Sequence, residues 1–140
     1  IGLNGRLDSI QAAILLEKLN IFDDELKMRN EINIYYRKYL NNAQHHPKEY
    51  ESAHALFSIV LGSNRKRKDL VERLSKNKIP SVIYYKFPIH LMKAFSYLGY
   101  KKDDFQVSEK LSKTIVSLPM HPYLSLNDID LIVKTIKKTK

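Results

Sequence analysis

The pattern that most constrains the fold is a short apolar run, an amphipathic helical pattern and a second apolar run in direct succession. The first run, residues 54–61, ends at a glycine, and its length and β-branched residues predict a strand that is buried on both faces. Ser63 or Asn64 can cap the following helix, and residues 81–85 read as a second strand. The inner stripe of this helix would consist of Leu70, Val71 and Leu74. A strand, a helix and a strand at this spacing predict a compact α/β unit.

Two helices are predicted before this unit. Asp8 and Gln11 form a capping box, which predicts a helix from there to about residue 21. A second helix is predicted from Asp23 or Asp24 to about residue 40. It shows the clearest helical period in the chain, with apolar side chains at Met28, Ile32, Tyr35, Tyr36, Tyr39 and Leu40. Because these tyrosines share one stripe, we expect them in a core or an interface rather than in a ligand site.

Further helices and a third short strand are predicted after this unit. A short helix over 90–98 should stop at Gly99, and an aspartate of the pair 103–104 should cap the helix that follows. Residues 116–120 form a short apolar segment that is a candidate third strand. The last helix opens with a capping box at 125–128 and is expected to bury Ile129, Ile132, Val133 and Ile136. The predicted fold is of the α/β class, with a small sheet and flanking helices.

Composition narrows the class of protein. The 140 residues are 44% hydrophobic and 28% charged, which is typical of a soluble globular protein rather than a disordered one. Because the sequence has no cysteine, disulfides and cysteine-ligated zinc sites are excluded. This suits a reducing compartment, and we expect a cytoplasmic location. No apolar run approaches the length that spans a bilayer, and no membrane partner is expected.

The formal net charge of +9 raises the question of an anionic partner. Residues 65–68 (RKRK) are the one tight basic cluster, and a nucleic-acid contact would use such charge. No aromatic residues are interleaved with the cluster and it opens an amphipathic helix, so a solvated first turn is favoured and no nucleic-acid partner is expected. Among the five histidines, His45 and His46 are neighbours in a loop without accompanying carboxylates, so no metal site is expected.

Two stretches carry residues suited to ligand binding. Asn4 and Arg6 flank a glycine, and an amide and a guanidinium can both donate to a phosphate. The equal alternative is that Arg6 pairs with Asp8 while Asn4 shapes the turn. The second stretch contains Tyr84 and Tyr85 before a proline-fixed turn, an arrangement that often forms a pocket wall. Simple packing of both tyrosines at a strand end is the alternative there.

We expect this chain to be a piece of a longer protein. It opens on a polar loop with two glycines, Gly2 and Gly5, which runs directly into an amphipathic helix. No initiator methionine and no approach strand precede the loop. A loop that carries Asn, Arg and Asp beside flexible glycines is usually held against another part of the protein. The opening motif is therefore expected to be where this piece meets the rest.

Residues 2–13 (GLNGRLDSIQAA) resemble the signature G-x-N-x-R-x-D-x-x-Q-A-A of the DegT/DnrJ/EryC1/StrS family of pyridoxal-phosphate-dependent nucleotide-sugar aminotransferases. The resemblance returns at 78–80, 84–85, 88–91 (PIHL), 94–95 and 98–100, and it ends in 117–124 (SLPMHPYL). It implies the C-terminal part of an enzyme of the aspartate aminotransferase fold type I, with long helices leading into a small α/β domain. Residues 1–45 would then be the end of the large domain and its linking helices, and residues 46–140 the small α/β domain.

The same resemblance implies pyridoxal 5'-phosphate as the cofactor and places the Schiff-base lysine upstream of this chain. No catalytic residue is therefore expected here, and the chain alone should be inactive. Asn4 would donate to the cofactor phosphate of the partner subunit in a homodimer, and Arg6 would contact the substrate there. Tyr84 and Tyr85 fall where some relatives carry His-Tyr near the substrate. Because Tyr84 departs from that histidine, the resemblance does not identify the sugar. His90 matches a motif without an implied role.

The implied activity is transfer of an amino group to a keto nucleotide-sugar, with glutamate as the expected donor. The product would enter surface polysaccharide, lipopolysaccharide or related amino-sugar biosynthesis. The alternative is a non-catalytic basic α/β module that binds or interacts with another molecule. A lysine in the family's motif upstream would support the enzyme, and its absence would support the module.

Overall fold

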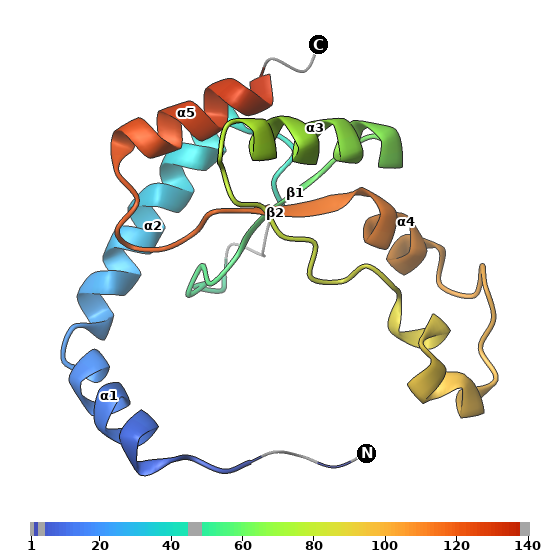
Figure 1. Ribbon diagram of the computed structural model, residues 1–140, viewed down its shortest axis with the longest axis horizontal. Coiled ribbons are helices and arrows are strands. Elements are labelled where there is room, and N and C mark those ends of the chain that lie inside the picture. Colours follow the sequence, from blue (N-terminus) through green and yellow to red (C-terminus); the bar gives the residue numbers. More distant parts are fainter. Residues whose placement is uncertain (1, 3–4, 45–48, 138–140) are drawn as a thin grey trace.

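The computed structural model describes residue 2, residues 5–44 and residues 49–137. Figure 1 shows helices gathered around a small sheet, with two arms that extend from this centre. The elements of the described residues are, in chain order, α1 (Ser9–Leu19), α2 (Phe22–Tyr39), β1 (Phe57–Val60), α3 (Asn64–Lys76), η1 (Ile89–Leu91), η2 (Lys93–Leu98), α4 (Gln106–Thr114), β2 (Ile115–Leu118) and α5 (Leu126–Lys137). One arm is α1, and the other holds the short 3₁₀ turns η1 and η2.

The sheet consists of two antiparallel strands, β1 and β2, in a register that places Phe57 opposite Leu118. A single bridge extends it at each edge, formed by Ala43 on the β1 side and by Val82 on the β2 side. Helix α3 lies between β1 and Val82 in the sequence. In the sheet, β2 lies between them, because it pairs with β1 on one side and with Val82 on the other. The predicted α/β class with a small sheet is confirmed.

The predicted strand at 54–61 is real but shorter, because only its second half pairs as β1. Its burial alternates along the strand, with Phe57 and Ile59 buried and the residues between and after them half-buried. The expectation of burial on both faces was therefore wrong: β1 has one core face, as strands of small antiparallel sheets do. The third predicted strand, at 116–120, is confirmed as β2 within two residues.

The predicted strand at 81–85 was wrong in extent. Only Val82 pairs with the sheet, donating its N–H to the Ser117 carbonyl at 3.0 Å and accepting from the Ser117 N–H at 2.9 Å. The chain then leaves the edge of β2, and the exposed side chains of Tyr84 and Tyr85 follow. Residues 81–85 thus have the composition of a strand, but they form a single bridge, because only Val82 comes close enough to β2 to pair with it.

The core lies between the sheet and helices α2, α3 and α5. Tyr36 is fully buried at its centre, where its ring centroid lies 4.7 Å from that of Phe57 and its O–H donates to the Pro119 carbonyl at 3.0 Å. Burial raises the pKa of this phenol. The predicted stripes of α2, α3 and α5 are confirmed in the main, and their buried members are Ile32, Tyr36, Leu40, Leu70, Leu74, Ile129, Ile132, Val133 and Ile136.

Most predicted helix ends are confirmed, but α2 begins at Phe22 without a side-chain cap and not at Asp23 or Asp24. The capping box of α1 is present, with the Asp8 carboxylate accepting from the Ile10 N–H at 2.8 Å, and that of α5 joins Ser125 and Asp128. The aspartate cap predicted for the helix after Gly99 was wrong, because α4 begins at Gln106. The Asp104 carboxylate instead accepts from the Lys101 N–H at 2.7 Å and closes a turn.

The segment predicted as a helix over 90–98 forms η1 and η2 instead. The stop at Gly99 is confirmed, since this residue takes the left-handed conformation with φ 77°. Short 3₁₀ turns of this kind are frequent as connectors, and here they build the outer arm between the Val82 bridge and α4.

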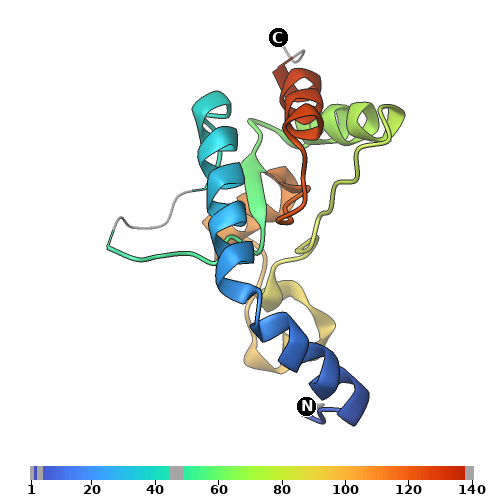
Figure 2. The same cartoon turned by 90° about the vertical axis from the view of Figure 1, so that its left-hand side faces the viewer.

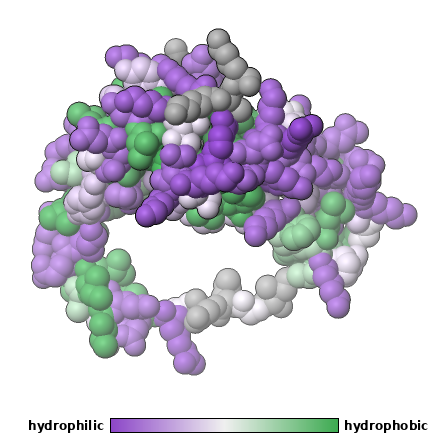
Figure 3. All heavy atoms as spheres, turned by 45° about the horizontal axis from the view of Figure 1, so that its top comes forward, coloured by the Kyte–Doolittle hydropathy of each residue, from purple (hydrophilic) through white to green (hydrophobic). Residues whose placement is uncertain are grey.

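Helix α1 projects away from the core, as the view in Figure 2 also shows. None of its residues is buried. Apolar side chains therefore lie at the surface of this arm and of the residue pair before it (Figure 3), namely Leu7, Ile10, Ile14, Leu15, Leu16 and Leu19. In the part of the chain that the structure describes, no helix combines the length and apolar character needed to cross a membrane.

Candidate functional site

A pocket of about 520 Å³ collects the tyrosines that the sequence singled out. Tyr84 and Tyr85 line it directly after the Val82 bridge, which fixes where they leave the sheet. Their ring centroids are 6.4 Å apart, and the two residues are 53% and 65% exposed. Both tyrosines therefore line a pocket and are not packed at a strand end, while their contact with a substrate stays a prediction.

The sheet supplies polar groups to the same pocket. Ser58 of β1 and Ser117 of β2 are opposite each other in the register, and both line the pocket. Their hydroxyl oxygens are 2.8 Å apart and share a hydrogen bond. Such a pair holds the two strands together at this point and presents hydroxyl groups to whatever the pocket takes up.

Helix α2 contributes a polar end of the pocket that the sequence did not reveal. The Arg37 Nε donates to the Asn33 Oδ1 at 2.8 Å, and the Arg37 Nη2 donates to the Gln44 carbonyl at 2.8 Å. All three residues line the pocket, and so does the buried His54. The i, i+4 spacing of Asn33 and Arg37 is the one sequence signal that could have indicated this pair.

The buried carboxylate of Glu109 forms hydrogen bonds with the segment that builds the outer wall of the pocket. Phe87, Pro88 and Ile89 line the pocket, and the next residue, His90, is buried. The His90 Nε2 lies 3.1 Å from the Glu109 Oε1, which also accepts from the Asp103 N–H at 2.6 Å. Glu109 of α4 therefore holds both ends of the arm that contains η1 and η2.

The protonation state of Glu109 reflects these contacts. Burial acts to raise the pKa of its carboxyl, but the hydrogen bonds from the Asp103 N–H and from His90 outweigh burial. The net pKa lies below its usual value, so the side chain is a carboxylate at neutral pH. His90, which the sequence left without a role, is thus a structural partner of this carboxylate.

The opening loop lies apart from this pocket. Arg6 is exposed and is not one of the pocket-lining residues. Figure 1 shows that its loop begins at the far end of the α1 arm. Asn4, the predicted contact of the cofactor phosphate, lies outside the described residues. The structure therefore brings together Tyr84 and Tyr85 but does not bring Arg6 to them within one chain.

The basic cluster at 65–68 opens α3, as predicted. Arg67 turns inward and donates to the Ser112 carbonyl at 2.6 Å and to the Asn64 Oδ1 at 3.1 Å, while the other three members are exposed. Within the described ranges, no group of three or more His, Cys, Asp or Glu side chains could hold a metal ion. His45 and His46 lie outside those ranges.

Together, the residues that line the pocket offer phenol rings and hydroxyl, amide and guanidinium groups. This combination suits a polar ligand that also presents flat or apolar faces, because rings give contact area while the polar groups fix orientation. The residues that line it come from α2, β1, β2, α4 and the segment after Val82, so the pocket exists only in the folded chain.

Comparisons with known proteins agree with the family resemblance. The DegT/DnrJ/EryC1/StrS aminotransferase family matches residues 1–137. The chain is 30% identical over 138 residues to the dTDP-3-amino-3,6-dideoxy-alpha-D-galactopyranose transaminase of Aneurinibacillus thermoaerophilus, a match that covers 98% of this chain and 38% of that protein. The chain thus spans about two fifths of the curated relatives that it matches.

Solved structures show the same likeness. A DegT/DnrJ/EryC1/StrS aminotransferase from Brucella abortus is 43% identical, with a TM-score of 0.84 and coverage of 99% of this chain and 37% of that one. A sugar aminotransferase from Streptococcus pneumoniae in its PLP form is 25% identical, with a TM-score of 0.85 and coverage of 95% and 36%. Because the family match spans nearly all its residues, this chain belongs to the DegT/DnrJ/EryC1/StrS aminotransferase family.

Proposed function

We propose that this chain is the C-terminal part of a pyridoxal-phosphate-dependent aminotransferase that transfers an amino group from glutamate to a keto nucleotide-sugar. The observation that carries the proposal is the family match over residues 1–137. A relative that acts on a dTDP-linked amino sugar and a neighbour in its PLP form support the substrate class and the cofactor. The product would enter surface polysaccharide, lipopolysaccharide or related amino-sugar biosynthesis in the cytoplasm.

Residues 1–45 would complete the large domain and link it to a small α/β domain over 46–140. The exposed apolar side chains of α1 support packing of this helix against another part of the protein or a second subunit, since a monomer rarely leaves such a face in water. We propose a homodimer in which each subunit lends its opening loop to the site of its neighbour.

The residues of the opening loop fit a phosphate-bearing cofactor and substrate in their chemistry. The N–H groups of an amide and of a guanidinium both donate hydrogen bonds to phosphate oxygens. Arg6 is exposed on its loop. Asn4 would donate to the cofactor phosphate in the partner's site, and Arg6 would bind the phosphate or the sugar of the substrate there. Pyridoxal phosphate supplies the electron sink when it is bound.

Tyr84 and Tyr85 would contact the substrate from the pocket wall, and they would orient it through their phenol groups and exclude water from one of its faces. The chain itself would position the substrate, while proton transfer would belong to the lysine of the remaining part of the enzyme. Tyr84 stands where some relatives carry histidine, so a change in sugar preference is expected from a Tyr84→His variant.

The full-length protein provides the direct test. We expect a preparation with the visible absorbance of bound pyridoxal phosphate, and glutamate-dependent conversion of one member of a panel of keto nucleotide-sugars to its amine, detected by mass spectrometry. A colourless protein that binds no cofactor and converts no member of the panel would contradict the proposal. It would favour a non-catalytic α/β module instead.

Subunit exchange tests the shared site. Asn4→Ala in full-length protein should weaken cofactor retention, and mixing it with a variant of the Schiff-base lysine should restore part of the activity. Both defects then fall in one site of the mixed dimer, which leaves the second site intact. If verified exchange restores nothing, Asn4 does not act across the interface.

A further inference from the structure

Within the part of the chain that the structure describes, few side-chain contacts join the α1 arm to the other elements. Helix α1 has no buried residue, and its neighbour is α2. Among the described residues, Lys18 near its C-terminal end makes the side-chain hydrogen bond and the ring contact that join α1 to the rest of the chain. The loop that carries Arg6 lies at the opposite end of this helix.

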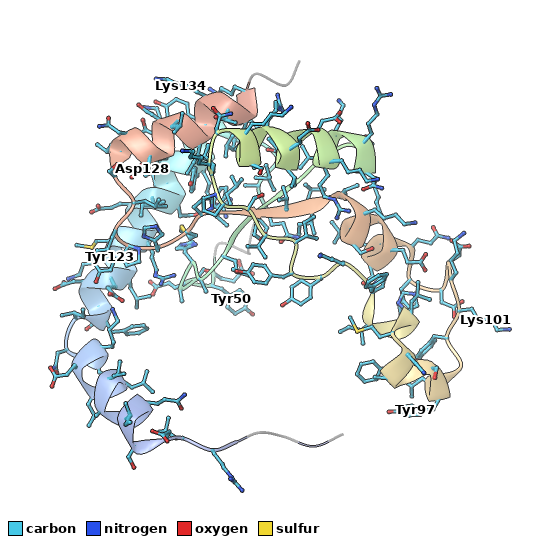
Figure 4. All side chains as sticks on the ribbon, viewed as in Figure 1. Tyr50, Tyr97, Lys101, Tyr123, Asp128 and Lys134 are labelled. Carbon is cyan, nitrogen blue, oxygen red and sulfur yellow. The ribbon has the colours of Figure 1, made fainter. Side chains whose placement is uncertain are left out.

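Lys18 meets two residues from different parts of the sequence. Its ammonium group forms an ion pair with the Glu25 carboxylate in the first turn of α2. The same Glu25 Oε1 accepts from the Tyr123 O–H at 2.5 Å, and the Lys18 Nζ lies 5.9 Å from the centroid of the Tyr123 ring. Tyr123 belongs to the segment between β2 and α5, and Figure 4 shows it beside α2. Three segments therefore converge on one carboxylate.

The contact has one buried acceptor and two donors that lie at the surface. Glu25 is only 9% exposed, whereas the Lys18 side chain is 47% exposed and Tyr123 is 64% exposed. Hydrogen bonds from Lys18 and then from Tyr123 hold the pKa of the Glu25 carboxyl below its usual value, and Arg29 adds to this effect. The hydrogen bond to Glu25 raises the pKa of Lys18 and that of Tyr123. At neutral pH the carboxylate, the ammonium and the neutral phenol are thus the favoured forms.

We propose that Lys18, Glu25 and Tyr123 are positioning residues, which set the direction of α1 and so place Arg6 for its contact with the nucleotide-sugar. This inference rests on the proposed function. The 11 residues of α1 span roughly 16 Å at about 1.5 Å per residue. A tilt of about 10° at Lys18 would therefore move the opening loop by roughly 3 Å, and a misplacement of about 1 Å already costs on the order of 100-fold in reactions that need exact positioning.

The test uses Glu25→Gln and Tyr123→Phe in full-length protein. At saturating pyridoxal phosphate, which offsets any weaker cofactor retention through Asn4 on the same loop, we expect KM for the nucleotide-sugar to rise about 10- to 100-fold with a smaller change in kcat, because the contact of Arg6 is misplaced. Deuterium exchange of the α1 amides should become faster in both variants. Lys18→Gln should behave likewise, and Lys18→Arg should retain a KM near that of the wild type.

Tyr35→Phe is the matched control. Tyr35 also donates to a carboxylate, that of Asp130, at 2.5 Å, but this pair joins α2 to α5 and does not involve α1. Its loss should leave KM and the exchange of α1 amides unchanged. If Glu25→Gln and Tyr123→Phe resemble Tyr35→Phe in KM, the proposed positioning role is wrong.

A double-variant comparison separates this inference from the proposed function. At saturating pyridoxal phosphate, Arg6→Ala alone should raise KM, and Glu25→Gln should add nothing further in the Arg6→Ala background, because both changes then remove the same substrate contact. Multiplicative effects would show that Glu25 acts independently of Arg6 and would overturn the inference alone. An unchanged KM in Arg6→Ala would overturn the assignment of Arg6 to the substrate, and the inference with it.

Discussion

Tyr35 on α2 donates a hydrogen bond to Asp130 on α5, with 2.5 Å between the phenol oxygen and the carboxylate oxygen. The two residues are 95 positions apart, so this bond joins two helices that are distant in the sequence, α2 and α5. It lies beside the core that α2 and α5 share, where the Tyr35 and Tyr39 rings are 5.1 Å apart.

The Tyr35–Asp130 bond predicts a pH dependence of stability in alkali. The hydrogen bond to Asp130, followed by burial, raises the pKa of Tyr35 from 10.0 to about 12. The folded state thus keeps a proton that the unfolded state loses, so the contribution is complete below pH 10.0 and disappears as the pH rises through about 12. Urea unfolding at about pH 9 and about pH 11 should show a larger loss of stability in the wild type than in Tyr35→Phe. Equal losses would contradict the prediction.

Leu74 carries a large share of the packing between α3 and the core. It is 0% exposed, and truncation would leave a cavity among fully buried neighbours. We expect Leu74→Ala to lower the free energy of unfolding by about 2–5 kcal/mol. Ser75→Ala, the exposed neighbour on the same helix, should change it by less than about 0.5 kcal/mol. Chemical denaturation of both variants measures the difference, and similar values would show that Leu74 is not a core residue.

Gly99 requires its own conformation at the end of η2. Its φ of 77° is left-handed, and an added Cβ would meet nothing within 4 Å, so the cost of a side chain is purely conformational. We expect Gly99→Ala to destabilise the protein by about 1–2 kcal/mol. Gly62→Ala is the matched control, since its backbone is not left-handed and its Cβ would meet only the Lys66 Cδ, at 4.0 Å. Thermal unfolding of the pair distinguishes conformation from a general effect of added bulk.

Glu109 should control the mobility of the arm that forms the outer wall of the pocket. Glu109→Ala removes the acceptor for the Asp103 N–H and for His90, so backbone amides of η1 and η2 should exchange faster while those of α5 stay unchanged. Glu109→Gln keeps an acceptor oxygen and should show a smaller effect. Uniformly faster exchange in both regions would indicate global destabilisation instead.

The pH dependence of this arm follows from the same carboxylate. Because the pKa of Glu109 lies below 4.5 in the folded state, its contribution to stability is present above pH 4.5 and is lost as the pH falls through the lower folded value. Exchange of η1 and η2 amides, corrected for intrinsic rates, should therefore increase in acid in the wild type more than in Glu109→Gln. If the exchange rates of these amides increase equally in the wild type and in Glu109→Gln as the pH falls, Glu109 is not the group responsible.

The sequence by itself determined the features that a few neighbouring residues decide. The capping boxes at Asp8 and Ser125 and the stop at Gly99 depend on contacts within three or four positions, so they could be predicted correctly. The helical periods of α2, α3 and α5 likewise fixed which faces are buried. Contiguous motifs identified the family, because each motif is itself a local string.

Only the tertiary structure decided the contacts between distant positions. Whether 81–85 becomes a strand depends on how much of it reaches β2, and the polar end of the pocket depends on where α2 places Arg37. Glu25 and Tyr123 are 98 positions apart, and no local pattern signals their bond. Closing such long loops is driven by burial of the shared core rather than by local preference. The sequence therefore indicated the tyrosines of the pocket, and the fold supplied the groups that surround them and the contacts of Glu25 with Lys18 and Tyr123.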